Sequence, residues 1–233
     1  MHIAVIDIGK PDKNLGWAIV GPSPASGTDL DKAIKAISNR ISRGPVAIGF
    51  EAPLYVPMRR SPGDLTKARK GECDGGVNRP FSASAGSTVL VIATVVVPYV
   101  LRALRSASPS CVATMNYREF FSAPSGVLFF EAFVTNQKNL HDARHIEDAK
   151  LAAQHLLQMY KKPSPLKSAV YEPKRLNLLG AMMLRTGWAS DLNVLNSECL
   201  VVRPPFREPL APKRYGRPRH ESRRARSRPA SAQ

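Results

Sequence analysis

Apolar runs bounded by turn residues alternate with segments of helical periodicity through the first fifty residues. The run His2–Ile8 is followed by the turn sequence GKPDKNLG and a second apolar run, Trp17–Val20, which together predict a β-hairpin. Between residues 30 and 42, isoleucines and other apolar residues recur at helical spacing, with basic residues on the other face. The apolar stretch VAIGFE then predicts an interior strand that ends in Glu51 and is stopped by Pro53.

The remaining chain continues this alternation. An apolar helix is expected over residues 86–105, and the stretch VLFFEAFV at 127–134 predicts a strand interrupted by Glu131. Residues 142–160 have the spacing of an amphipathic helix, residues 176–185 predict another, and 199–202 a short final strand. Strands that alternate with helices in this way predict an α/β fold.

Length and composition add the prediction of a soluble protein with one main core. The chain has 233 residues, a hydrophobic fraction of 43% and a formal net charge of +16, which excludes a collagen, a coiled coil and a disulfide mini-protein. Its three cysteines, Cys73, Cys111 and Cys199, have no paired spacing, so neither a disulfide framework nor a zinc site is expected. The start of the chain lacks the pattern of a signal peptide, and a cytoplasmic location is expected.

Half of the excess positive charge lies at the C-terminal end. Residues 203–233 hold ten Lys and Arg against two Asp and Glu, with six prolines and almost no aliphatic residues. We therefore expect a domain at residues 1–203 and a disordered basic tail at 204–233. Closely spaced guanidinium groups are typical of contact with nucleic acid, although a solubilising tail has the same composition.

The apolar segment starting at Phe81 has two interpretations. It has no charged residue through Leu101 and is close to the length of a membrane-spanning helix. However, it begins with small and polar residues, contains Pro98, and leaves a continuous apolar core of about 13 residues, which is nearer a buried helix. No membrane association is expected. A homodimer is a further hypothesis, with the helix over residues 86–104 as the one feature that offers a contact face.

Four carboxylates stand where local propensity does not favour them. Asp7, Glu51 and Glu131 lie in or at the end of predicted strands, and Asp148 lies on a helix among alanines. Buried carboxylates need compensation, and a cluster of them suggests divalent cations, with Mg²⁺ or Mn²⁺ favoured by oxygen ligands. Two such ions about 4 Å apart support hydrolysis of a phosphodiester. A turn cap or a salt bridge would place each acid equally well.

A basic connection follows the strand that ends in Glu51. It is expected to clamp a phosphate backbone, or else to be a solvated loop. Its candidate residues are Arg59, Arg60, Lys67, Arg69 and Lys70. Trp17 and Tyr55 are candidates for stacking on a base, although a tryptophan that opens a strand is more typical of a core.

Several of these segments resemble the RNase H-like superfamily. The stretch IAVIDIGKPDKNLGWAIV is similar to its first hairpin, in which Asp-x-Gly follows an apolar strand. AIGFEAPL and HIEDAKLAAQHLL resemble the second acidic strand and the last helix of RuvC-type resolvases. An uncharacterised group of predicted nucleases in this superfamily is closer, with an acid followed by Pro in the second motif and a helix like LGAMMLRTGW.

The resemblance implies a mixed sheet flanked by helices and a metal-dependent nuclease acting on DNA or RNA. It implies Asp7, Glu51 and Asp148 as metal ligands, with His145, three residues before Asp148, and Glu131 as further catalytic candidates. Two alternatives stay open. One is a non-catalytic nucleic-acid-binding protein on the same fold, and the other is an actin-like phosphotransferase that uses ATP, for which this chain is short.

Overall fold

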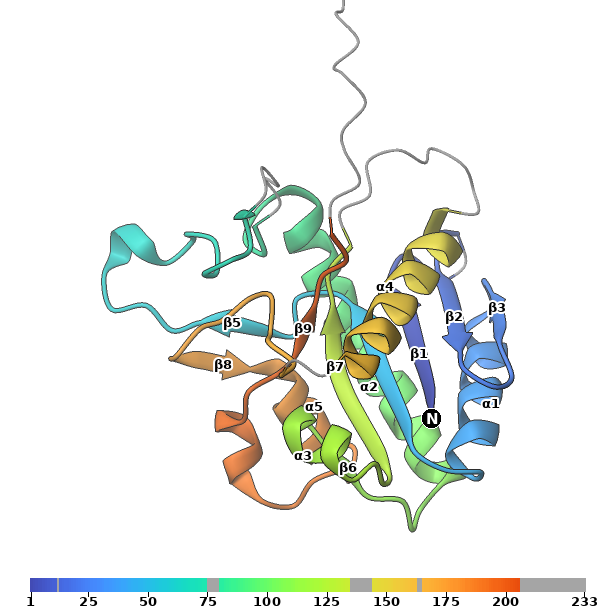
Figure 1. Ribbon diagram of the computed structural model, residues 1–233. Coiled ribbons are helices and arrows are strands. Elements are labelled where there is room, and N and C mark those ends of the chain that lie inside the picture. Colours follow the sequence, from blue (N-terminus) through green and yellow to red (C-terminus); the bar gives the residue numbers. More distant parts are fainter. Residues whose placement is uncertain (12, 75–79, 135–143, 163–164, 206–233) are drawn as a thin grey trace, which may run out of the picture.

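A seven-stranded mixed sheet forms the centre of the protein in the computed structural model, which describes residues 1–11, 13–74, 80–134, 144–162 and 165–205 (Figure 1). The strand order is β3-β2-β1-β4-β7-β6, and β9 pairs with β7 beyond β6. The strands are β1 (His2–Asp7), β2 (Gly16–Val20), β3 (Ala25–Gly27), β4 (Val46–Glu51), β6 (Ala113–Thr114), β7 (Val127–Ala132) and β9 (Val201–Val202).

The sheet is mixed because its connections are of two kinds. A short connection of eight residues joins β1 to β2, and these strands are antiparallel, as are β2 and β3. Helical crossovers precede β4 and β7, and these strands run parallel to β1. The short strands β6 and β9 share the edge of β7, β6 at its start and β9 at its end. The carboxyl ends of β1, β4 and β7 therefore lie together.

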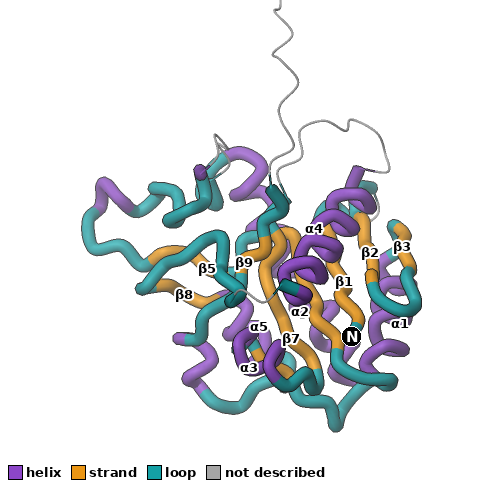
Figure 2. The backbone as a smooth tube through the Cα atoms, in the orientation of Figure 1, coloured by secondary structure: helices purple, strands orange, loops and turns teal. Residues whose placement is uncertain are grey.

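Helices cover both faces of the sheet (Figure 2). One face packs against α1 (Leu30–Ile41), α2 (Ser84–Ala107) and α5 (Leu178–Arg185), and the other packs against α3 (Tyr117–Ser122) and α4 (Arg144–Lys161). The sequence periodicity placed all but the six-residue α3 close to these positions. The α/β class with a mixed sheet flanked by helices is thus observed.

Strand alternation sorts the last residues of the parallel strands onto opposite faces. Because side chains point to alternate faces, laterally paired residues share a face. Phe50 pairs with Ile6 and with Glu131, and it belongs to the hydrophobic cluster under α1 and α2. Glu51 follows Phe50 directly, so its side chain points to the opposite face, which α4 covers. Its partner Asp7 lies on that same face.

A small lobe projects from the end of β4. It is built on a two-stranded antiparallel sheet of β5 (Tyr55–Pro57) and β8 (Arg175–Asn177), with the 3₁₀ turn η1 (Pro62–Asp64) at its outer part (Figure 1). We call residues 55–72 and 170–177 the β5–β8 lobe. A second 3₁₀ turn, η3 (Leu192–Asn196), precedes β9.

The lobe corrects the expected helix at residues 176–185. The helix begins only at Leu178, because the side chain of Asn177 caps it by accepting a hydrogen bond from the amide of Gly180. Residues 175–177 pair with β5 instead. The final strand is also shorter than expected, since only Val201 and Val202 are extended.

Helix α2 is long and apolar enough to cross a membrane, with a mean hydropathy of 2.0 in its most apolar window, of which 33% is buried in the fold. Its buried side contributes Val97 and Leu101 to the core, whereas Val91 and Val95 are exposed on the other side.

The basic tail expected from residue 204 lies outside the described residues from 206 onward. All three cysteines are free thiols.

Candidate metal centre

Asp7 and Glu51 lie side by side at the carboxyl end of the sheet. Each is the last residue of its strand, and the parallel register of β1 and β4 pairs them directly. Asp7 is 5% exposed, and Glu51 is half-buried. Directly paired side chains on one face stand about 5 Å apart, so two carboxylates are held together by backbone hydrogen bonds alone.

Helix α4 adds a third carboxylate. Asp148 lies in its second turn and is 4% exposed, with Ala149 and Ala152 buried against the sheet beside it. The alanines allow the helix axis to approach the sheet closely. Ligand oxygens of Asp7, Glu51 and Asp148 all lie within 4.8 Å of one another, and we call this group the acidic cluster.

Gly16 sets the position of α4. A Cβ atom at this residue would overlap the carbonyl carbon of His145 and the amide nitrogen of Ile146. Gly16 is also the partner of Asp7 across the β1–β2 ladder. The start of α4 therefore rests on bare backbone next to Asp7. Gly16 was not predicted as a site residue, because a glycine that opens a strand after a turn was its only signal in the sequence.

The acidic cluster is electrostatically strained without a counter-charge. Burial, together with the charge of Asp7, raises the pKa of Glu51 well above its usual range. The same two causes, in the same order, raise the pKa of Asp148 to about 6. Neighbouring carboxylates in a poorly hydrated site resist ionising together, so the cluster favours a cation or a proton.

Two basic groups at the start of α4 border the cluster. His145 Nδ1 lies 2.8 Å from Asp7 Oδ2, and this hydrogen bond raises the pKa of His145. Arg144 Nε lies 3.5 Å from Asp148 Oδ2, a distance too long for a good hydrogen bond. The side chains of His145 and Arg144 are 22% and 35% exposed, so both reach solvent at the edge of the site.

The remaining oxygens fit a divalent cation. Glu51 Oε2 and Asp148 Oδ1 are buried and have no hydrogen-bond partner among the described residues. Buried polar atoms normally have hydrogen-bond partners, and a site for an ion is one accepted reason for an exception. Three carboxylates without sulfur or an additional ring nitrogen form a hard donor set, which suits Mg²⁺ or Mn²⁺.

Glu131 does not join the acidic cluster. Its register position beside Phe50 turns it to the opposite face of the sheet. There it is 1% exposed, accepts a hydrogen bond from the amide of Leu54 at 2.9 Å, and binds Arg69 through both oxygens at 2.9 and 2.6 Å. The catalytic candidate Glu131 is therefore a member of a buried ion pair. The residue of β7 that lies beside Glu51 is Ala132, so Glu131, one position earlier, points to the other face of the sheet.

The basic connection is also corrected in part. Arg69 is fully buried and bridges Glu131 and Glu72, so it is unavailable to a phosphate backbone. Arg59 pairs with Glu172 at 2.6 Å and is 25% exposed. Arg69 thus ties the connection to β7, and Arg59 ties it to the segment that precedes β8.

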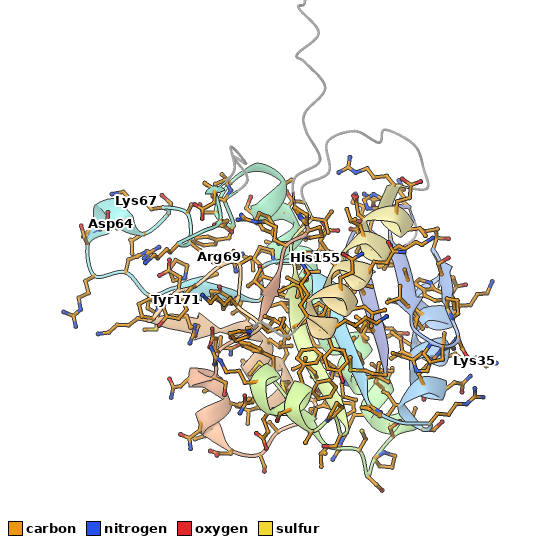
Figure 3. The ribbon with its side chains drawn as sticks, viewed as in Figure 1. Lys35, Asp64, Lys67, Arg69, His155 and Tyr171 are labelled. Carbon is orange, nitrogen blue, oxygen red and sulfur yellow. The ribbon has the colours of Figure 1, made fainter. Side chains whose placement is uncertain are left out.

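The other three basic residues of the connection remain at the surface. Lys67 pairs with Asp64 at 2.6 Å near the tip of the lobe, where Figure 3 labels both. Arg60 and Lys70 are exposed. Of the two aromatic candidates, Trp17 is 5% exposed and Tyr55 is fully buried, so both are core residues.

Comparison with models of known protein families, with curated proteins and with solved structures found no match to this chain. The acidic cluster and the groups around it are therefore the features that point to a function.

Proposed function

We propose that this protein is a Mg²⁺- or Mn²⁺-dependent phosphodiesterase that acts on nucleic acid. The observation that carries the proposal is the acidic cluster, in which three carboxylates from β1, β4 and α4 converge within 4.8 Å. Glu51 and Asp148 each have a buried oxygen that finds no partner in the part of the chain that the structure describes. Salt bridges or turn caps, the ordinary explanations for such acids, do not account for these oxygens.

The residues that would hold the ion are Asp7, Glu51 and Asp148. A divalent cation, when bound there, supplies Lewis-acid activation of a phosphodiester and lowers the pKa of a coordinated water. The chain itself supplies rigid positions for the ligands, since two lie on paired strands and the third lies on a helix packed against them.

The groups at the edge of the cluster have separate tasks in this proposal. Asp7 orients the ring of His145 through Nδ1, which leaves Nε2 to exchange a proton with water or with a leaving oxygen. Arg144 keeps a partly exposed guanidinium beside Asp148, where it neutralises charge on an approaching phosphate. Both act from the first turn of α4, whose dipole also favours anions.

Charge and architecture support a nucleic-acid substrate. A formal net charge of +16 attracts polyanions over long range. The mixed sheet, the opening hairpin that carries Asp7 and the helix that carries Asp148 also agree with the resemblance to the RNase H-like superfamily. We include an RNase H-like fold in the proposal on these grounds.

Calorimetric titration with Mn²⁺ and Mg²⁺ tests the metal centre, and a panel of labelled DNA and RNA tests cleavage. The wild type is expected to bind metal and cleave, whereas Asp7→Asn, Glu51→Gln and Asp148→Asn lose both. Glu147→Gln is the matched control because Glu147 is exposed on the same helix, next to Asp148. Unchanged cleavage by Asp7→Asn and Asp148→Asn would sink the proposal. Metal-independent, salt-dependent binding without cleavage would point to a non-catalytic nucleic-acid-binding protein.

A further inference from the structure

Cations and aromatic rings alternate through the β5–β8 lobe from its buried base to its surface. The guanidinium carbon of Arg69 lies 4.6 Å from the centre of the Tyr55 ring. Arg175 lies 5.8 Å from that same ring and 5.9 Å from the ring of Tyr171. These distances are within the range of cation–π attraction. Tyr171, the outermost member, is 45% exposed (Figure 3).

The acidic side chains of the lobe are occupied by partners within it. Glu172 binds Arg59 and also accepts from the backbone amide of Lys70. Glu72 binds Arg69, and Asp64 binds Lys67. The lobe therefore has no acid left over to neutralise further cations.

The cations around Tyr171 have no such partners. Within the described part of the chain, no ion pair involves Lys70, Lys174 or Arg175, and Arg175 Nε has no hydrogen-bond partner. Lys70 pairs with Tyr171 through backbone hydrogen bonding, and Lys174 lies three residues further along. The exposed ring of Tyr171 thus has one guanidinium against it, an exposed lysine on the backbone paired with it, and a second exposed lysine three residues away.

We propose that Tyr171, with Lys70, Lys174 and Arg175, is a docking platform for single-stranded nucleic acid. An exposed ring stacks on a base, and the adjacent cations bind the phosphates on either side of it. The bases of a duplex are already stacked on each other and present mainly phosphates. The platform therefore favours a single strand. This inference rests on the proposed function in that it names the form of its substrate.

The buried base of the β5–β8 lobe is close to the acidic cluster along the chain. Tyr55 is the fourth residue after Glu51, so their Cα atoms are at most about 14 Å apart. The backbone of Leu54 is fixed between them by its hydrogen bond to Glu131. The lobe extends from the carboxyl end of β4, the end that carries the cluster (Figure 1). A strand docked on the lobe can therefore continue toward the three carboxylates.

Fluorescence anisotropy with a labelled 20-nucleotide single strand and the matching duplex tests the platform. The full chain is used in EDTA and near-physiological salt, so that neither cleavage nor bound metal contributes. Tyr171→Ala is expected to weaken single-strand binding by about tenfold or more and to leave duplex binding nearly unchanged. Tyr171→Phe keeps the ring and is expected to bind as the wild type. Lys70→Gln and Lys174→Gln are each expected to reduce the salt dependence of binding by about one ion.

Matched controls lie on the opposite side of the molecule. Tyr99→Ala removes a ring that is 51% exposed on α2, and Lys35→Gln removes an exposed cation on α1 that Figure 3 shows far from Tyr171. Both are expected to bind like the wild type. The basic tail contributes equally to every variant.

The inference is overturned if Tyr171→Ala binds the single strand like the wild type, or loses single strand and duplex equally. In the first case the ring has no role in binding. In the second case the surface binds negative charge alone and would bind any acidic partner equally well. Either result leaves metal binding and cleavage untouched. The opposite combination is also distinguishable. If the wild type binds no metal, but single-strand binding depends on Tyr171 and is unchanged in Asp7→Asn, the proposed function is rejected and the platform is retained.

Discussion

Gly16 and His145 are in direct backbone contact, and no side chain heavier than hydrogen fits between them. A Cβ atom on Gly16 would overlap the carbonyl carbon of His145 at the start of α4. The glycine lies opposite Asp7 in the β1–β2 ladder, and His145 Nδ1 lies 2.8 Å from Asp7 Oδ2. This contact, together with the buried alanines of α4, therefore sets how near the helix brings Asp148 to the two carboxylates of the sheet.

Gly16→Ala is expected to push α4 away from β2 and to weaken metal binding. The overlap is with backbone atoms, which cannot rotate aside, so we expect a loss of about 1–3 kcal/mol in stability and a larger loss in metal affinity. Thermal unfolding and Mn²⁺ titration measure the two effects. Gly63→Ala is the control, since the nearest atom to its Cβ would be 3.9 Å away. Wild-type metal affinity in Gly16→Ala would show that α4 is positioned by other contacts.

Neutralising Asp148 is expected to stabilise the metal-free protein at neutral pH. Its folded-state pKa of about 6 is above the value of about 4 for an unfolded aspartate. Between these values the folded protein holds a proton that the unfolded chain has released, so the free energy of unfolding falls as pH rises through this window. The advantage of Asp148→Asn in Tm should be near zero at pH 4 and complete above about pH 6.

Added metal should make the wild type more stable than Asp148→Asn. Mn²⁺ stabilises only a protein that binds it, so the Tm of the wild type rises with metal concentration while that of Asp148→Asn does not. Glu147→Gln should resemble the wild type in EDTA and in Mn²⁺. An Asp148→Asn protein less stable than the wild type in EDTA at pH 7.5 would mean that the carboxylates are not in repulsive contact.

Breaking the buried ion pair is expected to be costly. Arg69→Met leaves Glu131 and Glu72 buried without a counter-charge, and such a loss is typically about 3–5 kcal/mol. Lys67→Met removes an ion pair whose side chains are 70% and 43% exposed, and should cost less than about 1 kcal/mol. Urea unfolding compares the two. Similar small losses would show that the Arg69 pair is not sealed from water.

Glu131→Gln tests whether Glu131 stabilises the fold or binds the metal. It should lower stability, because Arg69 loses a bidentate partner, yet leave Mn²⁺ affinity unchanged in the protein that remains folded. The measurement is a Mn²⁺ titration well below the Tm. Lost metal binding in a folded Glu131→Gln protein would place Glu131 back among the ligands.

Removing the ring of His145 should lower the cleavage rate more than the metal affinity. His145→Ala keeps all three carboxylates, so Mn²⁺ affinity should change little, while cleavage of a nucleic acid substrate should fall by about 10²-fold or more if the ring transfers a proton. Single-turnover rates at saturating Mn²⁺ measure the effect. Equal cleavage by wild type and His145→Ala would restrict His145 to orienting Asp7.

The sequence could predict the long strands, the four longer helices and the three grouped acids, because these depend on local patterns and short motifs. Asp7 and Glu51 end apolar strands, and Asp148 follows His145 at helical spacing, so periodicity and motif placed them. Glu131 looked the same in the sequence as Glu51, and only the pairing of β7 with β4 shows that they face opposite sides. The partners of Arg69 are as far as 62 residues away, beyond any local pattern.

The register of β1 against β4 also makes the site unusually vulnerable to one kind of genetic change. A single codon inserted or deleted within β4 would shift Glu51 by one position and direct its carboxylate through the sheet to the face occupied by Phe50. Most substitutions in this strand alter packing and leave the acid where it is. Over evolutionary time, lineages that retain the cluster should therefore tolerate variation in the residues of β4 far better than variation in its length.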